Sequence, residues 1–202
     1  MVSDLLTVGD AHKLAAEDTG LAKLLAWVES FPMNPHPDLG RSGAVCPFAR
    51  TASKYDMLRL RVSECGPDDE AHAFRLMCGS YADLESIPAN ADTEKYRAVI
   101  VGFPNCVSED GVAMLQRVQK RHKYRAVLKR RMLGYMYPGA QAPGLWNKEF
   151  RPLAAPMPVI VVRNFVEQDS LFVAGQKLQW PPYLLLFGIG GAQRLLSRRR
   201  AS

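Results

Sequence analysis

The chain has 202 residues, of which 48% are hydrophobic and 23% are charged. A chain of this length and composition can bury one core, so we expect a globular domain and exclude an intrinsically disordered protein. The formal net charge is +6. Eight Lys or Arg residues cluster between Arg117 and Arg131, and a cluster of this kind indicates an anionic partner.

The cysteines and the N-terminus indicate the compartment. The four cysteines, Cys46, Cys65, Cys78 and Cys106, contain no CxxC pair, so we expect no structural zinc site. The N-terminus mixes charged residues among its apolar ones and does not resemble a signal peptide, which predicts a cytoplasmic protein with reduced thiols. The longest apolar run, Pro181 to Ile189, is too short to span a bilayer.

The first half of the chain predicts helices and two strands. Residues Asp10 to Glu29 have the apolar spacing of one or two helices, with a break at Thr19-Gly20. Residues Met57 to Val62 alternate apolar and basic side chains and predict a half-buried strand. A helix is expected over Asp68 to Ile87, and Tyr96 to Phe103 reads as a buried strand.

The second half predicts one long helix, a strand and a short helix. Ser108 is a suitable N-cap for a helix that we expect to run to about Met136. A proline-rich loop follows over Gln141 to Pro158, and Pro158 to Arg163 has the composition of a third buried strand. Gln168 to Ser170 can begin a further short helix.

Helices and strands of similar weight without regular βαβ alternation predict the α+β class, with a mixed sheet and packed helices. We expect a single domain over residues 1–180. Residues 181–202 join an apolar stretch to a basic end, and this segment can dock on the core, lie on a membrane surface or stay mobile. Docking on the core is the expectation.

The long helix carries basic residues where an apolar face is expected. At about 100° per residue, its apolar stripe has Arg121 and Arg125 near the centre and His122 on the shoulder. The stripe is formed by Met114, Val118, Met132 and Met136. Because unpaired buried charge is costly, inward arginines would require an anionic ligand or acidic side chains in a cavity. The alternatives are a bend or break near Arg121, or guanidinium groups that reach the edge of the stripe.

The most chemically dense window is His36 to Phe48, which we call the signature loop. It combines His36, Arg41 and Cys46 with two prolines and two glycines. Proline fixes φ and glycine permits positive φ, so this pattern predicts a rigid, shaped loop, and such loops often carry sites.

Cys46 is the candidate nucleophile or metal ligand of this loop. It precedes Pro47, which lacks an N–H, and the neighbouring Arg41 would favour the thiolate. A thiolate can ligate ferric haem or attack a substrate, whereas the common alternative is an inert core thiol. His36 is either a metal ligand or a structural hydrogen-bonding group of the loop.

The signature loop resembles the signature of a small, largely uncharacterised family of bacterial proteins found often in actinomycetes. The resemblance extends from Trp27 to Phe172. It includes the Gly144 to Asn147 turn, the Arg151-Pro152 pair, and a late strand that ends in Arg163 and an Asp169-x-x-Phe172 step.

In layout, the chain is also distantly similar to the YqcI/YcgG-type proteins. The shared order is a Cys-Pro-Phe-like loop, a helical middle region and a late proline-rich turn that leads into a strand. Some of those proteins are haem-dependent enzymes that oxidise nitrogen in amino-acid-derived substrates of natural-product pathways. The resemblance implies a haem cofactor, dioxygen or peroxide, and a small amine substrate.

The first functional hypothesis is therefore a haem-dependent oxidoreductase of oxygenase type, acting on a small amine or amino-acid-derived metabolite that bears a carboxylate. The haem would lie between the signature loop and the long helix. Its axial ligand would be His36 or Cys46, with His122 in reserve. The cofactor-binding cations would be Arg41, Arg121 and Arg125.

Two alternatives remain open. One is a non-enzymatic basic module that binds nucleic acid or an acidic partner, although no helix-turn-helix, zinc-finger or RNP pattern accompanies the charge. The other is covalent catalysis by Cys46. The sequence leaves the substrate and the oligomeric state open.

Overall fold

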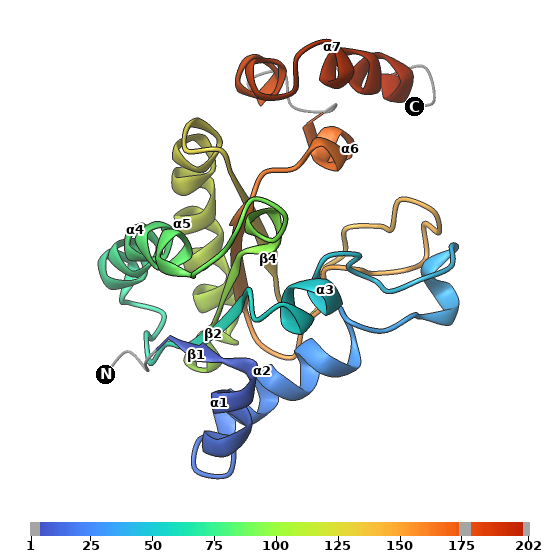
Figure 1. The fold of residues 1–202 in the computed structure, drawn as a ribbon. Coiled ribbons are helices and arrows are strands. Elements are labelled where there is room, and N and C mark those ends of the chain that lie inside the picture. The colour runs from blue at the N-terminus through green and yellow to red at the C-terminus, as the bar shows by residue number, and fades with distance from the viewer. Residues whose placement is uncertain (1–4, 174–178, 200–202) are drawn as a thin grey trace.

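The fold is a mixed sheet with helices on both faces (Figure 1). The structure is a computed structural model that describes residues 5–173 and 179–199. Within these residues, five strands lie in the order β1-β2-β3-β5-β4. The strands are β1 (Leu6–Thr7), β2 (Leu58–Val62), β3 (Ala98–Gly102), β4 (Arg131–Met136) and β5 (Val159–Asn164).

The helices confirm the α+β class predicted from the sequence. They are α1 (Val8–Leu14), α2 (Thr19–Ser30), α3 (Ala49–Lys54), α4 (Glu70–Ser86), α5 (Glu109–Leu128), α6 (Ser170–Val173) and α7 (Trp180–Arg199). The sequence predicts one or two helices over Asp10 to Glu29, and the structure has two, α1 and α2. The side chains of Thr7 and Asp18 cap α1 and α2 respectively, and Ser108 caps α5 as expected.

The two faces of the sheet are covered by different helices. α2 packs against one face. Its Leu24 lies so close to Gly102 of β3 that a Cβ added to this glycine would stand 3.2 Å from the leucine side chain. α4 and α5 cover the opposite face (Figure 1), where the Tyr135 hydroxyl donates to the carbonyl of Val112 at 2.9 Å. β3, in the centre, is buried along its whole length. No helix of the described residues is long and apolar enough to cross a membrane.

The predicted extension of the long helix to Met136 is wrong. α5 ends at Leu128, and the chain reverses at Arg130, whose φ is 60°. Residues 131–136 then pair antiparallel with β5 from end to end. This pairing satisfies the backbone groups along one side of β5, and that gain outweighs the helical tendency of the segment and the strain of a left-handed arginine.

The early end of α5 changes which of its side chains face the core. Once Met132 and Met136 belong to a strand, they no longer define the helical stripe, and the buried face rotates. It is formed by Met114, Leu115, Val118, His122 and Ala126. The prediction that Arg121 and Arg125 point inward is wrong, because both are exposed. A break near Arg121 is also contradicted, since α5 is continuous there.

The C-terminal helices form a small cluster of their own beside the end of the sheet. α6 and α7 pack together around Phe165, Val173, Tyr183 and Leu195, and they lie at the top of Figure 1. α7 has a kink at Gly188, where φ is 53° and ψ is −139°. A residue with a side chain adopts this backbone conformation only with strain.

Two helical glycines should respond oppositely to alanine. In Gly111→Ala the new Cβ would stand 2.6 Å from the Cys106 Cα, so the backbone must shift and we expect a loss of about 1–3 kcal/mol. Gly79 has nothing within 4 Å of its position, so Gly79→Ala should gain about 1 kcal/mol. Urea unfolding measures both, and a Gly111→Ala protein as stable as the native chain would refute this account of the α5 start.

Candidate functional site

The signature loop folds back on the end of α2. The Val45 N–H donates to the Asn34 carbonyl and the Cys46 N–H donates to the Pro32 carbonyl, both at 2.9 Å. An isolated antiparallel bridge joins Pro35 and Ala44. The loop is therefore ordered by its own backbone, as its prolines and glycines predict.

Arg41 holds the signature loop together from inside. Its Nη1 donates to the Ser42 carbonyl at 2.8 Å, and its Nη2 donates to the carbonyls of Ala44 and Val45 at 2.9 and 3.2 Å. An arginine has five N–H donors, and three hydrogen bonds of Arg41 go to its own loop. This arrangement gives Arg41 a structural role that sequence analysis did not foresee.

His36 lies in an aromatic cluster. Its ring centroid is 5.9 Å from that of Phe31 and 4.8 Å from that of Phe150. Its Nδ1 accepts a hydrogen bond from the Asp38 N–H at 3.2 Å. In the neutral ring the proton is then on Nε2, so His36 presents a donor rather than a bare nitrogen.

The segments that carry the family resemblance meet around this loop. Gly40, with φ of 76°, lies so close to Trp146 that an added Cβ would stand 3.0 Å from the Trp146 Cβ. The side-chain amide of Asn147 donates to the Asp38 carbonyl at 2.8 Å. The loop and the Gly144 to Asn147 turn are therefore one structural unit.

A buried ion pair connects the other end of the loop to β5. The Arg163 guanidinium carbon lies 5.2 Å from the ring centroid of Phe48. Both Arg163 Nη atoms donate to the carboxylate of Asp169, which is 1% exposed and also accepts from the Val166 N–H. Such a bidentate pair has fixed geometry, so it positions Phe48 and the loop end.

The cysteines differ in accessibility. All four are free thiols, and Cys46 and Cys78 are half-buried whereas Cys65 and Cys106 are buried. Burial raises the pKa of the Cys106 thiol to about 11 and also raises the pKa of Cys65. A low thiolate population makes the two buried thiols poor nucleophiles.

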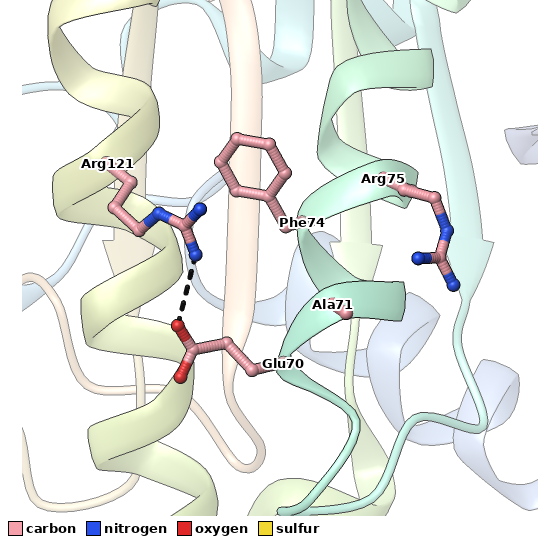
Figure 2. A pocket seen from close by; sticks show the side chains of 5 residues that line it. All are labelled: Glu70, Ala71, Phe74, Arg75 and Arg121. Carbon is pink, nitrogen blue, oxygen red and sulfur yellow. Dashed lines mark hydrogen bonds and ion pairs between the residues drawn. The ribbon is translucent and has the colours of Figure 1, made fainter.

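A second region of interest lies on the outer surface of α4 and α5. Arg117 Nε and Arg121 Nη1 both donate to the Glu70 carboxylate, at 2.9 and 3.3 Å, and these bonds lower the pKa of Glu70. The Arg121 guanidinium carbon stands 4.3 Å from the ring centroid of Phe74. Glu70 and Phe74 reach from α4 towards Arg121, whereas Arg75 extends from the far side of α4 (Figure 2).

These side chains border a shallow open pocket of about 350 Å³, lined by Glu70, Ala71, Phe74, Arg75 and Arg121. Further along α5, Arg125 Nη1 contacts the Cys78 sulfur at 3.6 Å. Lys129 Nζ then lies 5.8 Å from the ring centroid of Tyr81. Cations of α5 therefore face α4 at every turn.

We call the exposed cations of α5, together with its C-cap Lys129, the basic face. They are Arg117, Lys120, Arg121, Arg125 and Lys129. α5 has no acidic residue after Asp110, and among the described residues only Glu70 pairs with the basic face. Like charges four residues apart destabilise a helix by about 0.2–0.5 kcal/mol per pair, so the basic face lowers the stability of α5.

His122 lies beneath the basic face and is fully buried. Its Nε2 donates to the Phe74 carbonyl at 3.1 Å, and its Nδ1 accepts from the Tyr81 hydroxyl at 3.3 Å. Both nitrogens are thus engaged between α4 and α5. Burial, with smaller effects of Arg125 and Arg121, lowers the pKa of His122.

The candidate residues named from the sequence fall into two separate groups. His36, Arg41 and Cys46 lie in the signature loop, while Arg121, His122 and Arg125 lie on α5, across the sheet in Figure 1. Among the described residues, no group of three or more His, Cys, Asp or Glu side chains could hold a metal ion. The single pocket expected between the loop and the helix is therefore not formed by these six residues.

Sequence reasoning missed the contributions of α4 and β5. Glu70 and Phe74 complete the surface around Arg121, and their spacing of four residues on a predicted helix was a usable signal. The pairing of Arg163 with Asp169 has a signal only in the resemblance, which includes both residues but gives neither a role.

The comparisons with known proteins identify a family. A family model described as a domain of unknown function (DUF6875) matches residues 21–198, and the chain therefore belongs to this family. The matched range contains the 27–172 segment on which the resemblance to an uncharacterised family rests. The chain matches no curated protein and no solved structure.

The buried His122 should make the stability of the protein depend on pH. Its pKa lies below the ordinary value of 6.5. On acidification, therefore, the histidine of the unfolded chain is protonated at a higher pH than the histidine of the folded chain. The free energy of unfolding should be insensitive to this group about one pH unit or more above 6.5 and should fall as the pH drops through and below that value. Urea unfolding across this range measures the slope.

His122→Gln should flatten that slope, since glutamine does not titrate. The matched control is His72→Gln, which removes an exposed histidine of α4 and should keep the native slope. Equal slopes for His122→Gln and the native protein would contradict the assignment.

Proposed function

We propose that this protein binds nucleic acid, and that the basic face of α5 holds the phosphate backbone. The observation that carries the proposal is a row of exposed cations on one helix, opposed by a single described carboxylate. Phosphate contacts by Lys and Arg supply most of the sequence-independent affinity of nucleic-acid-binding proteins.

The spacing of the row suits a phosphate backbone. Arg117, Arg121, Arg125 and Lys129 are each four residues apart, and a rise of 1.5 Å per residue makes the row about 18 Å long. A nucleic-acid strand carries a phosphate about every 3.4 Å along a duplex axis. A strand that follows α5 would therefore place several phosphates within reach of the row.

The surface beside Arg121 supplies an apolar contact as well as charge. Phe74 is half-buried between the Arg121 guanidinium and the ring of His122, whose centroid lies 4.2 Å away, and it borders the pocket described above. The group at this surface that can stack on a base is therefore the exposed guanidinium of Arg121, which Phe74 supports from beneath. Guanidinium groups of a cationic surface contribute to stacking on bases in single-stranded nucleic acid. The proposal therefore favours a single strand over a duplex.

The alternative role for these cations is to stabilise the fold, and the contacts argue against it. The side chains of Arg117 and Arg121 are 57% and 58% exposed, and salt bridges at such exposure contribute little stability. Among the side chains of α5 that the structure describes, the buried ones are apolar apart from His122, so packing does not require the basic face.

Replacing two cations of the basic face should lower the affinity for nucleic acid and make that affinity less dependent on salt. For Arg121→Ala/Arg125→Ala, the slope of log K against log salt should decrease in magnitude by about 1.4 on a single strand and about 1.8 on a duplex. Fluorescence anisotropy with labelled oligonucleotides over a salt series measures both. The control Lys23→Ala/Lys54→Ala removes two exposed lysines of α2 and α3 and should leave the slope unchanged.

Glu70 provides a test of opposite sign. Its carboxylate occupies N–H groups of Arg117 and Arg121 that a phosphate would use, so Glu70→Gln should tighten binding. Absence of binding at low salt, or equal losses in the paired variants and the lysine control, would refute the proposal.

A second candidate function is the haem-dependent oxidation of a small amine or amino-acid-derived substrate, which the similarity in layout to the YqcI/YcgG-type proteins implies. The observation that favours it is that the signature loop, whose Cys-Pro-Phe step is part of that layout, is an ordered loop with a half-buried free thiol at Cys46. Cys46 fits the role of an axial thiolate ligand. His36 fits it less well, because its Nδ1 is engaged and its Nε2 carries the proton.

A bound haem would supply the redox chemistry, while the protein would hold it and orient the substrate. Arg41 donates three hydrogen bonds to carbonyls of its own loop. Arg121 and Arg125 lie on α5, on the other side of the sheet. Arg121 and Arg125 are therefore not placed to pair with a propionate beside Cys46, whereas Arg41 lies in the same loop and has N–H donors left. The remaining possibility for this thiol is the covalent catalysis named above, which needs no cofactor.

An absorbance spectrum separates these roles of Cys46. Protein produced with ample haem should show a Soret band that Cys46→Ala abolishes and His36→Gln retains, since we expect ligation by sulfur. A colourless native protein would refute haem binding. Loss of the band in His36→Gln alone would assign the ligand to the histidine instead.

A further inference from the structure

We infer that α7 attaches the protein to an anionic lipid surface. α7 is apolar on two sides, and only one of them is buried. Tyr183 and Leu195 pack into the cluster with α6, whereas Leu185, Ile189 and Leu196 are 83%, 80% and 57% exposed. Large apolar side chains at such exposure, gathered on one element, mark an interaction surface.

The exposed apolar residues of α7 lie on both sides of its kink. Gly188 interrupts the helix between Leu185 and Ile189, and its position is open, with nothing within 4 Å of an added Cβ. Phe172 of α6, 47% exposed, adds an aromatic side chain from the helix that packs against α7. Shallow insertion of such residues is typical of helices that lie in a membrane interface.

The charge of this region selects the partner. From Ser170 to the C-terminus the sequence contains Lys177, Arg194 and the Arg198 to Arg200 run, and it contains no acidic residue. Just before this stretch, Glu167 pairs with Arg194 at 2.8 Å, so the excess positive charge comes from the other cations. Contact between two copies through α7 would bring like charges together. An anionic lipid surface is instead attracted by about 1 kcal/mol for each nearby cation.

The proposed attachment is peripheral and separate from the basic face. α7 is not long and apolar enough to span a bilayer, and its kink suits a helix that lies along the surface. α5 and α7 occupy different parts of the molecule in Figure 1. The inference therefore does not depend on nucleic-acid binding.

Sedimentation with lipid vesicles tests the inference on the full chain. Vesicles of phosphatidylcholine alone are compared with vesicles that also contain phosphatidylglycerol. We expect binding only to the anionic vesicles, with a decrease as salt is added. Leu185→Ser/Ile189→Ser keeps the charge and should weaken binding about tenfold or more, because it removes the inserted apolar area.

The matched control is Leu14→Ser/Leu145→Ser, which removes two leucines that are 42% and 52% exposed elsewhere and should bind like the native protein. Unchanged binding of Leu185→Ser/Ile189→Ser would overturn the inference and assign vesicle binding to other cations. Absence of vesicle binding would also overturn it. If the native protein is then a dimer by light scattering and the α7 variant is a monomer, this surface is a contact between copies.

Discussion

The pairing of β4 with β5 is the interaction on which the remainder of the structure depends. It takes residues 131–136 out of the helix that precedes them and ends α5 at Leu128. It also places Tyr135 under α5, where its hydroxyl bonds to the Val112 carbonyl. The rotation of α5 about its own axis is fixed by these contacts, and that rotation decides which side chains are solvent-exposed.

This rotation separates the two regions that we consider functional. The basic face lies on one side of the sheet with α4, and the signature loop lies on the other side with α2 and the Gly144 to Asn147 turn. Each region is complete without the other. His122 links the basic face to the core, because its ring bonds to both the Phe74 carbonyl and the Tyr81 hydroxyl.

Much of the fold could be predicted from local patterns, while the site could not. Alternation predicted β2, a β-branched run predicted β3 and β5, and Ser108 marked the start of α5, because each signal acts over a few residues. The end of α5 depends on hydrogen bonds to β5, about thirty residues further along the chain, and no local pattern encodes them. The error in Arg121 and Arg125 followed directly, since Met132 and Met136 were counted on the wrong element.

The internal bonds of Arg41 change what its motif can be used to infer. Lysine has one nitrogen and could not reach three carbonyls in the fork geometry that a guanidinium provides. A chain with the same arginine between its glycines would share the shape of the loop, whatever molecule that loop recognises. Presence of the motif is thus a guide to architecture, and chemistry must be read from the residues whose polar atoms remain available.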